Sequence, residues 1–161
     1  MQTNLVRNIM SPLLFACALT TLVAAERAPR GAVGGKLTGT WNMQITLNDC
    51  SGHVIRSFPT LVEFVAGGTL TEASGGTAPA LVTGGKGVWS HTVDSTYAFR
   101  FKDFTFNAQN TLVGWSIISG ETTVDETGNA SAGPATVEIY NAGGVLVATF
   151  CADALGTRFE L

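Results

Sequence analysis

The sequence has little charge, which argues against several classes of partner. Only 13% of the 161 residues are Asp, Glu, Lys or Arg, and the formal net charge is −3. Nucleic-acid binding normally requires clustered Lys and Arg, whereas the nine basic residues are scattered along the chain. We therefore expect no nucleic-acid partner.

Residues typical of catalytic and metal sites are also scarce. The chain has two histidines, His53 and His91, and neither has a second His, Cys or carboxylate at metal-ligand spacing. No Gly-x-Ser-x-Gly motif, paired-carboxylate motif or phosphate-binding loop occurs. The sequence thus predicts no catalytic residue, no metal site and no cofactor, and it favours a binding protein over an enzyme.

The long apolar run lies at the N-terminus and has the pattern of a signal peptide. Arg7 supplies a positive charge, residues 9–23 are mostly apolar, and Ala24-Ala25 provide small residues suited to cleavage. The run is short and is broken by Pro12, so it does not predict a membrane span. We expect residues 1–25 to be removed and the protein to be exported, either to a periplasm or outside the cell.

A lipoprotein signal is the competing interpretation of the same segment. Residues 14–17 resemble a bacterial lipoprotein box, which would make Cys17 a lipidated N-terminus. The bulky Phe15 and the apolar residues that follow Cys17 favour ordinary cleavage after Ala25 instead.

Cleavage after Ala25 leaves a chain with two cysteines, Cys50 and Cys151. Two thiols in an oxidising compartment predict one disulfide. Residues 26–37 are rich in Gly, Pro and Ala without an apolar pattern, which is typical of a flexible lead-in. The remainder, residues 38–161, is long enough for one domain with a single core.

That domain is predicted to be all-β. No sustained helical period follows residue 23, whereas apolar and polar residues alternate in runs separated by Gly, Asn and Asp. The apolar phase shifts within the aromatic run 97–106, which predicts a bulge near Lys102-Asp103. The expected strands are 38–48, 54–66, 69–73, 86–93, 97–106, 112–124, 130–140 and 145–152.

An even number of strands in a meander allows the last strand to pair antiparallel with the first. Closure removes both exposed sheet edges, which otherwise invite aggregation. We therefore predict a closed up-and-down antiparallel barrel of about eight strands. The longest irregular segment, 74–85, contains Leu81-Val82, which could fold over the barrel mouth.

The start and end of this domain resemble the calycin superfamily, which includes lipocalins and avidins. Gly39-Thr40-Trp41 matches the Gly-x-Trp that opens their barrel, and Arg158 stands where the last strand of that group supplies an Arg or Lys against the Trp. The resemblance implies structural roles for Trp41 and Arg158 and stacking of guanidinium on indole. The second lipocalin motif, the C-terminal helix and the pocket tryptophans of avidin are not matched, and the chain is also similar to small exported bacterial proteins of unassigned role.

The disulfide and the Trp–Arg pair test closure together. Opposing Trp41 to Arg158 and Cys50 to Cys151 requires ladder registers that differ by two residues, which a bulge near Gly156 could absorb. The alternation also lets Trp41 and Arg158 point inward while both sulfurs point outward.

The interior of an eight-stranded barrel is either packed solid or holds one small ligand. With nine Phe and three Trp, the chain could do either. Tyr97 or His91 would orient a ligand, although a lone His on such a strand is more often structural. Asp94 could orient His91 as a base, but it fits the role of a turn residue equally well. Glu63 and Glu72 are expected to face solvent, because unpaired burial would be costly. The residues expected to point inward and contact a ligand are Met43, Ile45, Phe58, Val62, Phe64, Trp89, His91, Tyr97, Phe99, Phe101, Trp115 and Ile117.

Three functions are compatible with these features. The first is binding of a small apolar or aromatic ligand inside the barrel. The second is protein binding, as in exported barrel-type protease inhibitors, with residues 26–36 or 74–85 entering the target's cleft. The third is an enzyme resembling the allene oxide cyclase or dirigent barrels, which act largely by shape. We rank them in that order.

Overall fold

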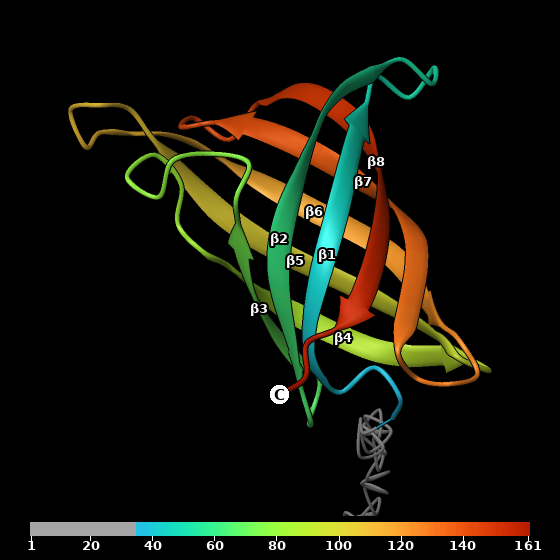
Figure 1. Cartoon of the computed structure of the whole chain (residues 1–161). Coiled ribbons are helices and arrows are strands. Elements are labelled where there is room, and N and C mark those ends of the chain that lie inside the picture. Colours follow the sequence, from blue (N-terminus) through green and yellow to red (C-terminus); the bar gives the residue numbers. More distant parts are fainter. Residues whose placement is uncertain (1–34) are drawn as a thin grey trace, which may run out of the picture.

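The computed structural model describes residues 35–161, which form a closed barrel of antiparallel strands (Figure 1). Each strand pairs with the next, and the eighth returns to the first, so the predicted fold class is confirmed. No helix in the described part of the chain is long and apolar enough to cross a membrane. The strands are β1 (Gly39–Asn48), β2 (Val54–Val65), β3 (Thr69–Ser74), β4 (Gly85–Val93), β5 (Thr96–Phe106), β6 (Leu112–Val124), β7 (Ala130–Asn141) and β8 (Leu146–Arg158).

The predicted signal peptide (1–25), Cys17 and most of the expected lead-in lie outside the described residues. Seven strands match the expected ranges to within about a residue at either end, but β8 continues six residues past the expected end at Ala152. Its second half carries small inward residues, Ala154 and Gly156, beside the exposed outward Leu155. This pattern hides the usual alternation of apolar inward and polar outward residues.

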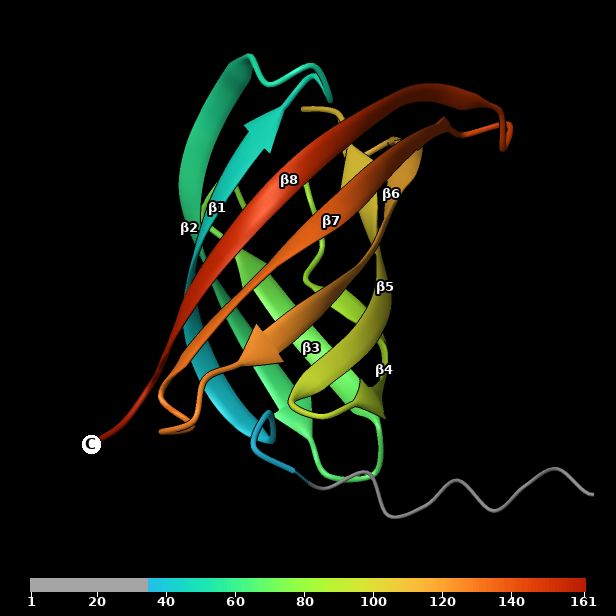
Figure 2. The same ribbon diagram turned by 90° about the vertical axis from the view of Figure 1, so that its right-hand side faces the viewer.

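The barrel closes along the ladder between β1 and β8, which lie side by side in Figure 2. Pairing runs without interruption from Trp41 opposite Arg158 to Asn48 opposite Cys151. The expected bulge near Gly156 is therefore wrong. Cys50 lies two residues beyond the end of β1, in the following turn, and reaches Cys151 from there with a Cα–Cα distance of 4.8 Å. The predicted disulfide is confirmed, and it is compatible with an exported protein.

The expected bulge at Lys102-Asp103 is also wrong. The β5–β6 ladder runs continuously from Thr96 to Thr105, and its register shifts only between Thr105 and Phe106. Phe99, Phe101 and Asp103 consequently share the inner face, as every second residue of a regular strand does. The apparent change of phase arises because Phe104 is an aromatic residue on the outer face, with 41% of its surface exposed.

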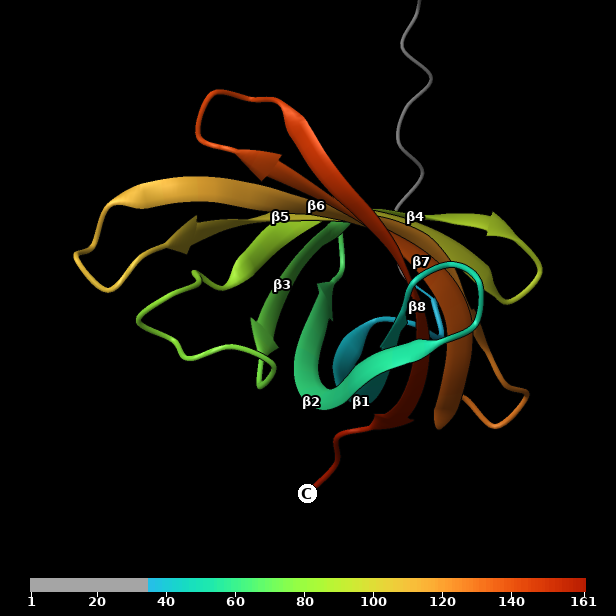
Figure 3. The ribbon, with the colours of Figure 1, turned by 90° about the horizontal axis from the view of Figure 1, so that it is seen from above.

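The two ends of the barrel differ. One end carries the connections 49–53, 75–84, 107–111 and 142–145 and faces the viewer in Figure 3. The opposite end carries the turns 66–68, 94–95 and 125–129 together with residues 35–38. The largest buried side chains, including Trp41, gather at this second end. We call the first end the mouth and the second the closed end.

The closed end is built around Trp41, which is fully buried. The Arg158 guanidinium lies over its indole, 4.5 Å from Cζ to the ring centroid, and the indole Nε1 donates to the Leu37 carbonyl at 2.8 Å. Arg158 also donates to the carbonyls of Gly128 and Thr38, at 2.8 and 2.9 Å. The fully buried Leu37 thus joins the barrel's core from outside the first strand.

Candidate functional site

A cavity of about 360 Å³ occupies the barrel between the closed end and the mouth. Its wall is mostly apolar, and the 75–84 connection contributes to it through Thr77 and Val82. Val82 is held there by a β-bridge to Thr105. Seven of the residues expected in the interior line this cavity, namely Met43, Ile45, Phe58, Val62, Phe64, Phe99 and Phe101.

Two other expected interior residues form the packed floor below the cavity. Trp89 and Tyr97 are buried, with their rings edge to face at 5.7 Å between centroids. Trp89 Nε1 donates to the carbonyls of Val65 and Thr69, at 3.1 and 2.9 Å, which fixes the indole in the closed half. Solid packing and a cavity, the two alternatives left open by the sequence, therefore both occur, in different halves of the barrel.

His91 does not reach the cavity. Its side chain is exposed, and Nε2 lies 2.7 Å from the main-chain carbonyl oxygen of Asp94. The contact is to the backbone of the turn, so the Asp94 carboxylate does not orient His91 as a base. His91 instead closes the β4–β5 turn and packs against the Tyr97 ring.

Trp115 and Ile117 point to the outer face, contrary to expectation. Ser116 and Ile118 line the cavity, so the alternation of β6 places their neighbours outside. Trp115 stacks on Tyr140 at 5.8 Å between ring centroids, and Lys102 Nζ lies 4.1 Å from its centroid. Because these two neighbours half-bury the indole on the outer surface, hydrophobicity alone did not indicate the face it takes.

Glu72 is buried in the cavity wall, where the sequence predicted a solvent-facing residue. Only 9% of its surface is exposed. Thr60 Oγ1 donates to Oε1 at 2.6 Å, and the Gly85 amide donates to Oε2 at 3.3 Å. Gly85 is needed here, since a Cβ at this position would lie 3.0 Å from Oε2 and 2.6 Å from the Phe101 ring. Hydrogen-bond donors on β2 and β4 offset the cost of burying the carboxylate, and the sequence alone does not show that these donors lie beside it.

Asp103 is the second carboxyl group in the wall, and sequence reasoning missed it. The Ser116 amide donates to its Oδ1 at 3.2 Å. Burial raises the pKa of Asp103. Burial, together with the nearby charge of Asp103, also raises the pKa of Glu72. The available signal is a carboxyl that interrupts an apolar strand, a pattern that also predicts a bulge.

One further polar side chain in the cavity wall lacks a partner. Thr122 is 2% exposed, and its Oγ1 accepts or donates no hydrogen bond within residues 35–161. An unpaired buried hydroxyl costs about 1–3 kcal/mol. A ligand with a polar group could recover part of this cost.

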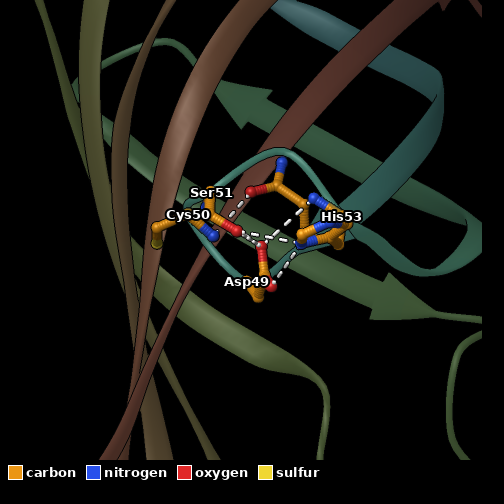
Figure 4. Close-up of polar contacts among 5 residues, drawn as sticks. Asp49, Cys50, Ser51 and His53 are labelled. Carbon is orange, nitrogen blue, oxygen red and sulfur yellow. Dashed lines mark hydrogen bonds and ion pairs between the residues drawn. The ribbon is translucent and has the colours of Figure 1, made fainter.

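The turn that holds Cys50 contains a Ser–His–Asp cluster, drawn in Figure 4. Ser51 Oγ and Asp49 Oδ2 both lie near the same ring nitrogen, Nδ1 of His53, at 3.0 and 3.1 Å. A catalytic triad needs the Ser and the Asp on opposite ring nitrogens, so this arrangement does not activate Ser51. Bonds from Ser51 and His53 lower the pKa of Asp49 to about 2 and stabilise the turn.

Within the described range, no group of three or more His, Cys, Asp or Glu side chains could hold a metal ion. No protein-family model matches the chain, and no curated protein matches it. The closed barrel of eight antiparallel strands is consistent with a calycin-like fold.

Proposed function

We propose that this protein is an exported, lipocalin-like binding protein that holds one small, mostly apolar molecule in the open half of its barrel. The observation that carries the proposal is the cavity of about 360 Å³. Ligand pockets in proteins commonly enclose about 300–1,000 Å³ and combine an apolar wall with a few polar groups. The cavity here has both properties.

The shape of the wall favours a flat ligand. Phe99 and Phe101 lie on the same face of β5, with nearly parallel rings 6.2 Å apart, and Phe58 and Phe150 add further aromatic surface. A continuous strand ladder already holds the Phe99 and Phe101 rings in place. Little conformational entropy is therefore lost in ordering them when a ligand binds. Burial of apolar ligand surface supplies about 25 cal/mol per Å² as the driving force.

The protein-binding alternative receives less support from the mouth. The 74–85 segment is one of the two segments expected to enter a target's cleft, and it is bonded to β5 through Thr83 and Leu81. The Thr83 amide donates to Phe104, and the Leu81 carbonyl accepts from Phe106, at 2.9 and 2.8 Å. A loop held in this way serves better as a wall of the cavity than as a free inhibitory segment.

Titration with N-phenyl-1-naphthylamine, an uncharged fluorescent probe, tests the proposal. We expect saturable binding that weakens about tenfold or more in Val137→Trp, because Val137 lines the cavity and a Trp there would fill it. The matched control is Thr136→Trp, which places the same side chain on the exposed face of β7. Absence of saturable binding, or equal affinity in the two variants, would contradict the proposal.

A further inference from the structure

The charged residues of the cavity do not balance one another. Its wall contains three such side chains, Arg56, Glu72 and Asp103. Arg56 is exposed, donates through Nη1 to the Gly76 carbonyl and lies over the Phe58 ring, 4.8 Å from its centroid. Within residues 35–161 neither Glu72 nor Asp103 forms an ion pair with a Lys or Arg. Two acidic groups therefore face a mostly apolar space, and neither is paired with a cation among the described residues.

The backbone brings the two acids to one place. Glu72 of β3 pairs with Gly85 of β4, and the next pair along β4 joins Lys86 to Lys102 of β5. On β4, Gly85 therefore lies between Glu72 on β3 and Asp103 on β5. Because Gly85 has no side chain, it places none between the two carboxyl groups on the inner face. Two strand spacings amount to about 10 Å between backbones. Both side chains point inward from these positions, and the charge of one carboxyl acts on the other.

The hydrogen bonds already present leave these carboxyls able to accept more. An ionised carboxylate has about four acceptor positions, whereas Glu72 receives one bond on each oxygen and Asp103 receives the Ser116 amide. An ammonium group has three donors and could join both residues. The Phe101 ring, which lies close to Gly85, adds an aromatic face that attracts cations.

We infer that the ligand of this barrel is an apolar, aromatic-sized molecule that carries a protonated amine, and that Glu72 and Asp103 bind its ammonium group. The inference rests on the proposed function. It has a second, independent support in Thr122, whose buried and unpartnered hydroxyl also lies in the cavity wall. This hydroxyl is a polar group, apart from the acids, to which a ligand in the cavity could hydrogen-bond. An anionic ligand would instead meet two like charges.

The pH dependence of amine binding follows from the charged groups that line the cavity. These are Arg56 on β2, Glu72 on β3 and Asp103 on β5. Burial raises the pKa of both acids, and an ammonium beside them would lower it again. Binding therefore releases protons, and affinity for an amine falls as the pH falls through the raised pKa of the carboxyls.

Three probes with one skeleton test the inference: 2-(1-naphthyl)ethylamine, 2-(1-naphthyl)ethanol and 1-naphthylacetate. In calorimetry on the full chain at pH 8, we expect the amine to bind about tenfold tighter than the alcohol, and the carboxylate to bind weakest. Glu72→Gln and Asp103→Asn should each remove most of the preference for the amine while changing the affinity for the alcohol by about twofold or less.

The Gln side chain can keep the local hydrogen bonds. Its Oε1 can accept from the Gly85 amide, and its Nε2 can donate to Thr60 Oγ1, which then donates to the Ala73 carbonyl that it already contacts at 3.0 Å. The matched control is Glu63→Gln, which removes an exposed acid from the outer face of β2. Glu63→Gln should leave all three affinities unchanged.

The outcomes separate the two proposals. Equal or tighter binding of the alcohol or carboxylate, or an amine preference that survives in both Glu72→Gln and Asp103→Asn, overturns the inference and leaves the proposed function standing. The same holds if N-phenyl-1-naphthylamine binds but none of the three probes does. If no probe of either experiment binds, the proposed function fails and the inference fails with it.

Discussion

Replacing the cysteines tests how much the disulfide contributes to this barrel. Cys50 and Cys151 are 101 residues apart in sequence, so the bond closes most of the domain into one loop. In the chain-entropy account, a loop of this length destabilises the unfolded chain by about 4–5 kcal/mol. Cys50 is exposed and Cys151 lies on the outer face, so Cys50→Ser/Cys151→Ser removes the cross-link with little loss of packing.

We expect the double variant to unfold with a free energy about 4–5 kcal/mol below that of the oxidised protein. Since single domains are stable by about 5–15 kcal/mol, this is a large part of the total. Urea unfolding followed by Trp fluorescence measures the difference, and the slope with urea should rise because the unfolded chain is free to expand.

The control is the unsubstituted protein under reductant, which should unfold at the same urea concentration as the double variant. If the variant is unfolded without urea, both curves can be measured in sucrose, which stabilises folded states. A loss of unfolding free energy below about 1 kcal/mol, with an unchanged urea slope, would refute the chain-entropy reasoning for the Cys50–Cys151 disulfide.

Two further predictions concern the carboxyl in the wall and the closed end. Because burial raises the pKa of Glu72, its ionisation opposes folding; Glu72→Gln should therefore be more stable than the unsubstituted protein above the raised pKa, and the gain should shrink as the pH falls towards 4.5. Urea unfolding between about pH 4 and 8 measures this, and a gain that is independent of pH would contradict it. In a double-mutant cycle of Trp41→Leu and Arg158→Met, we expect a coupling free energy of about 0.5–2 kcal/mol from the stacked guanidinium. Additive effects would mean that Arg158 acts only through its carbonyl contacts.

The strands were predictable because their signals are local. Alternation of apolar and polar residues and the turn residues between them indicated eight strands, and an even strand number made closure the way to remove both edges. The two cysteines of residues 26–161 were predictable as a pair for a similar reason, since the number of partners was limited to one. Seven cavity residues followed from the same alternation, applied strand by strand.

Orientation was harder to predict where both faces of a strand carry apolar residues. On β6, Trp115 and Ile118 point to opposite faces, and each is half-buried. The face that Trp115 takes depends on Tyr140 and Lys102, which come from the two neighbouring strands. A register error of one residue exchanges the two faces, and only the paired strands set the register.

The sequence by itself determined the eight strands, the cysteine pair and the aromatic residues available to fill the interior, because each depends on spacing along the chain. Tertiary structure alone decided that the closed half is solid, that the open half holds a cavity, and that Glu72 and Asp103 lie in its wall. A carboxyl can be buried only where donors meet it, and the donors to Glu72 come from Thr60 and Gly85 on two other strands. Such an encounter exists only after the barrel has closed.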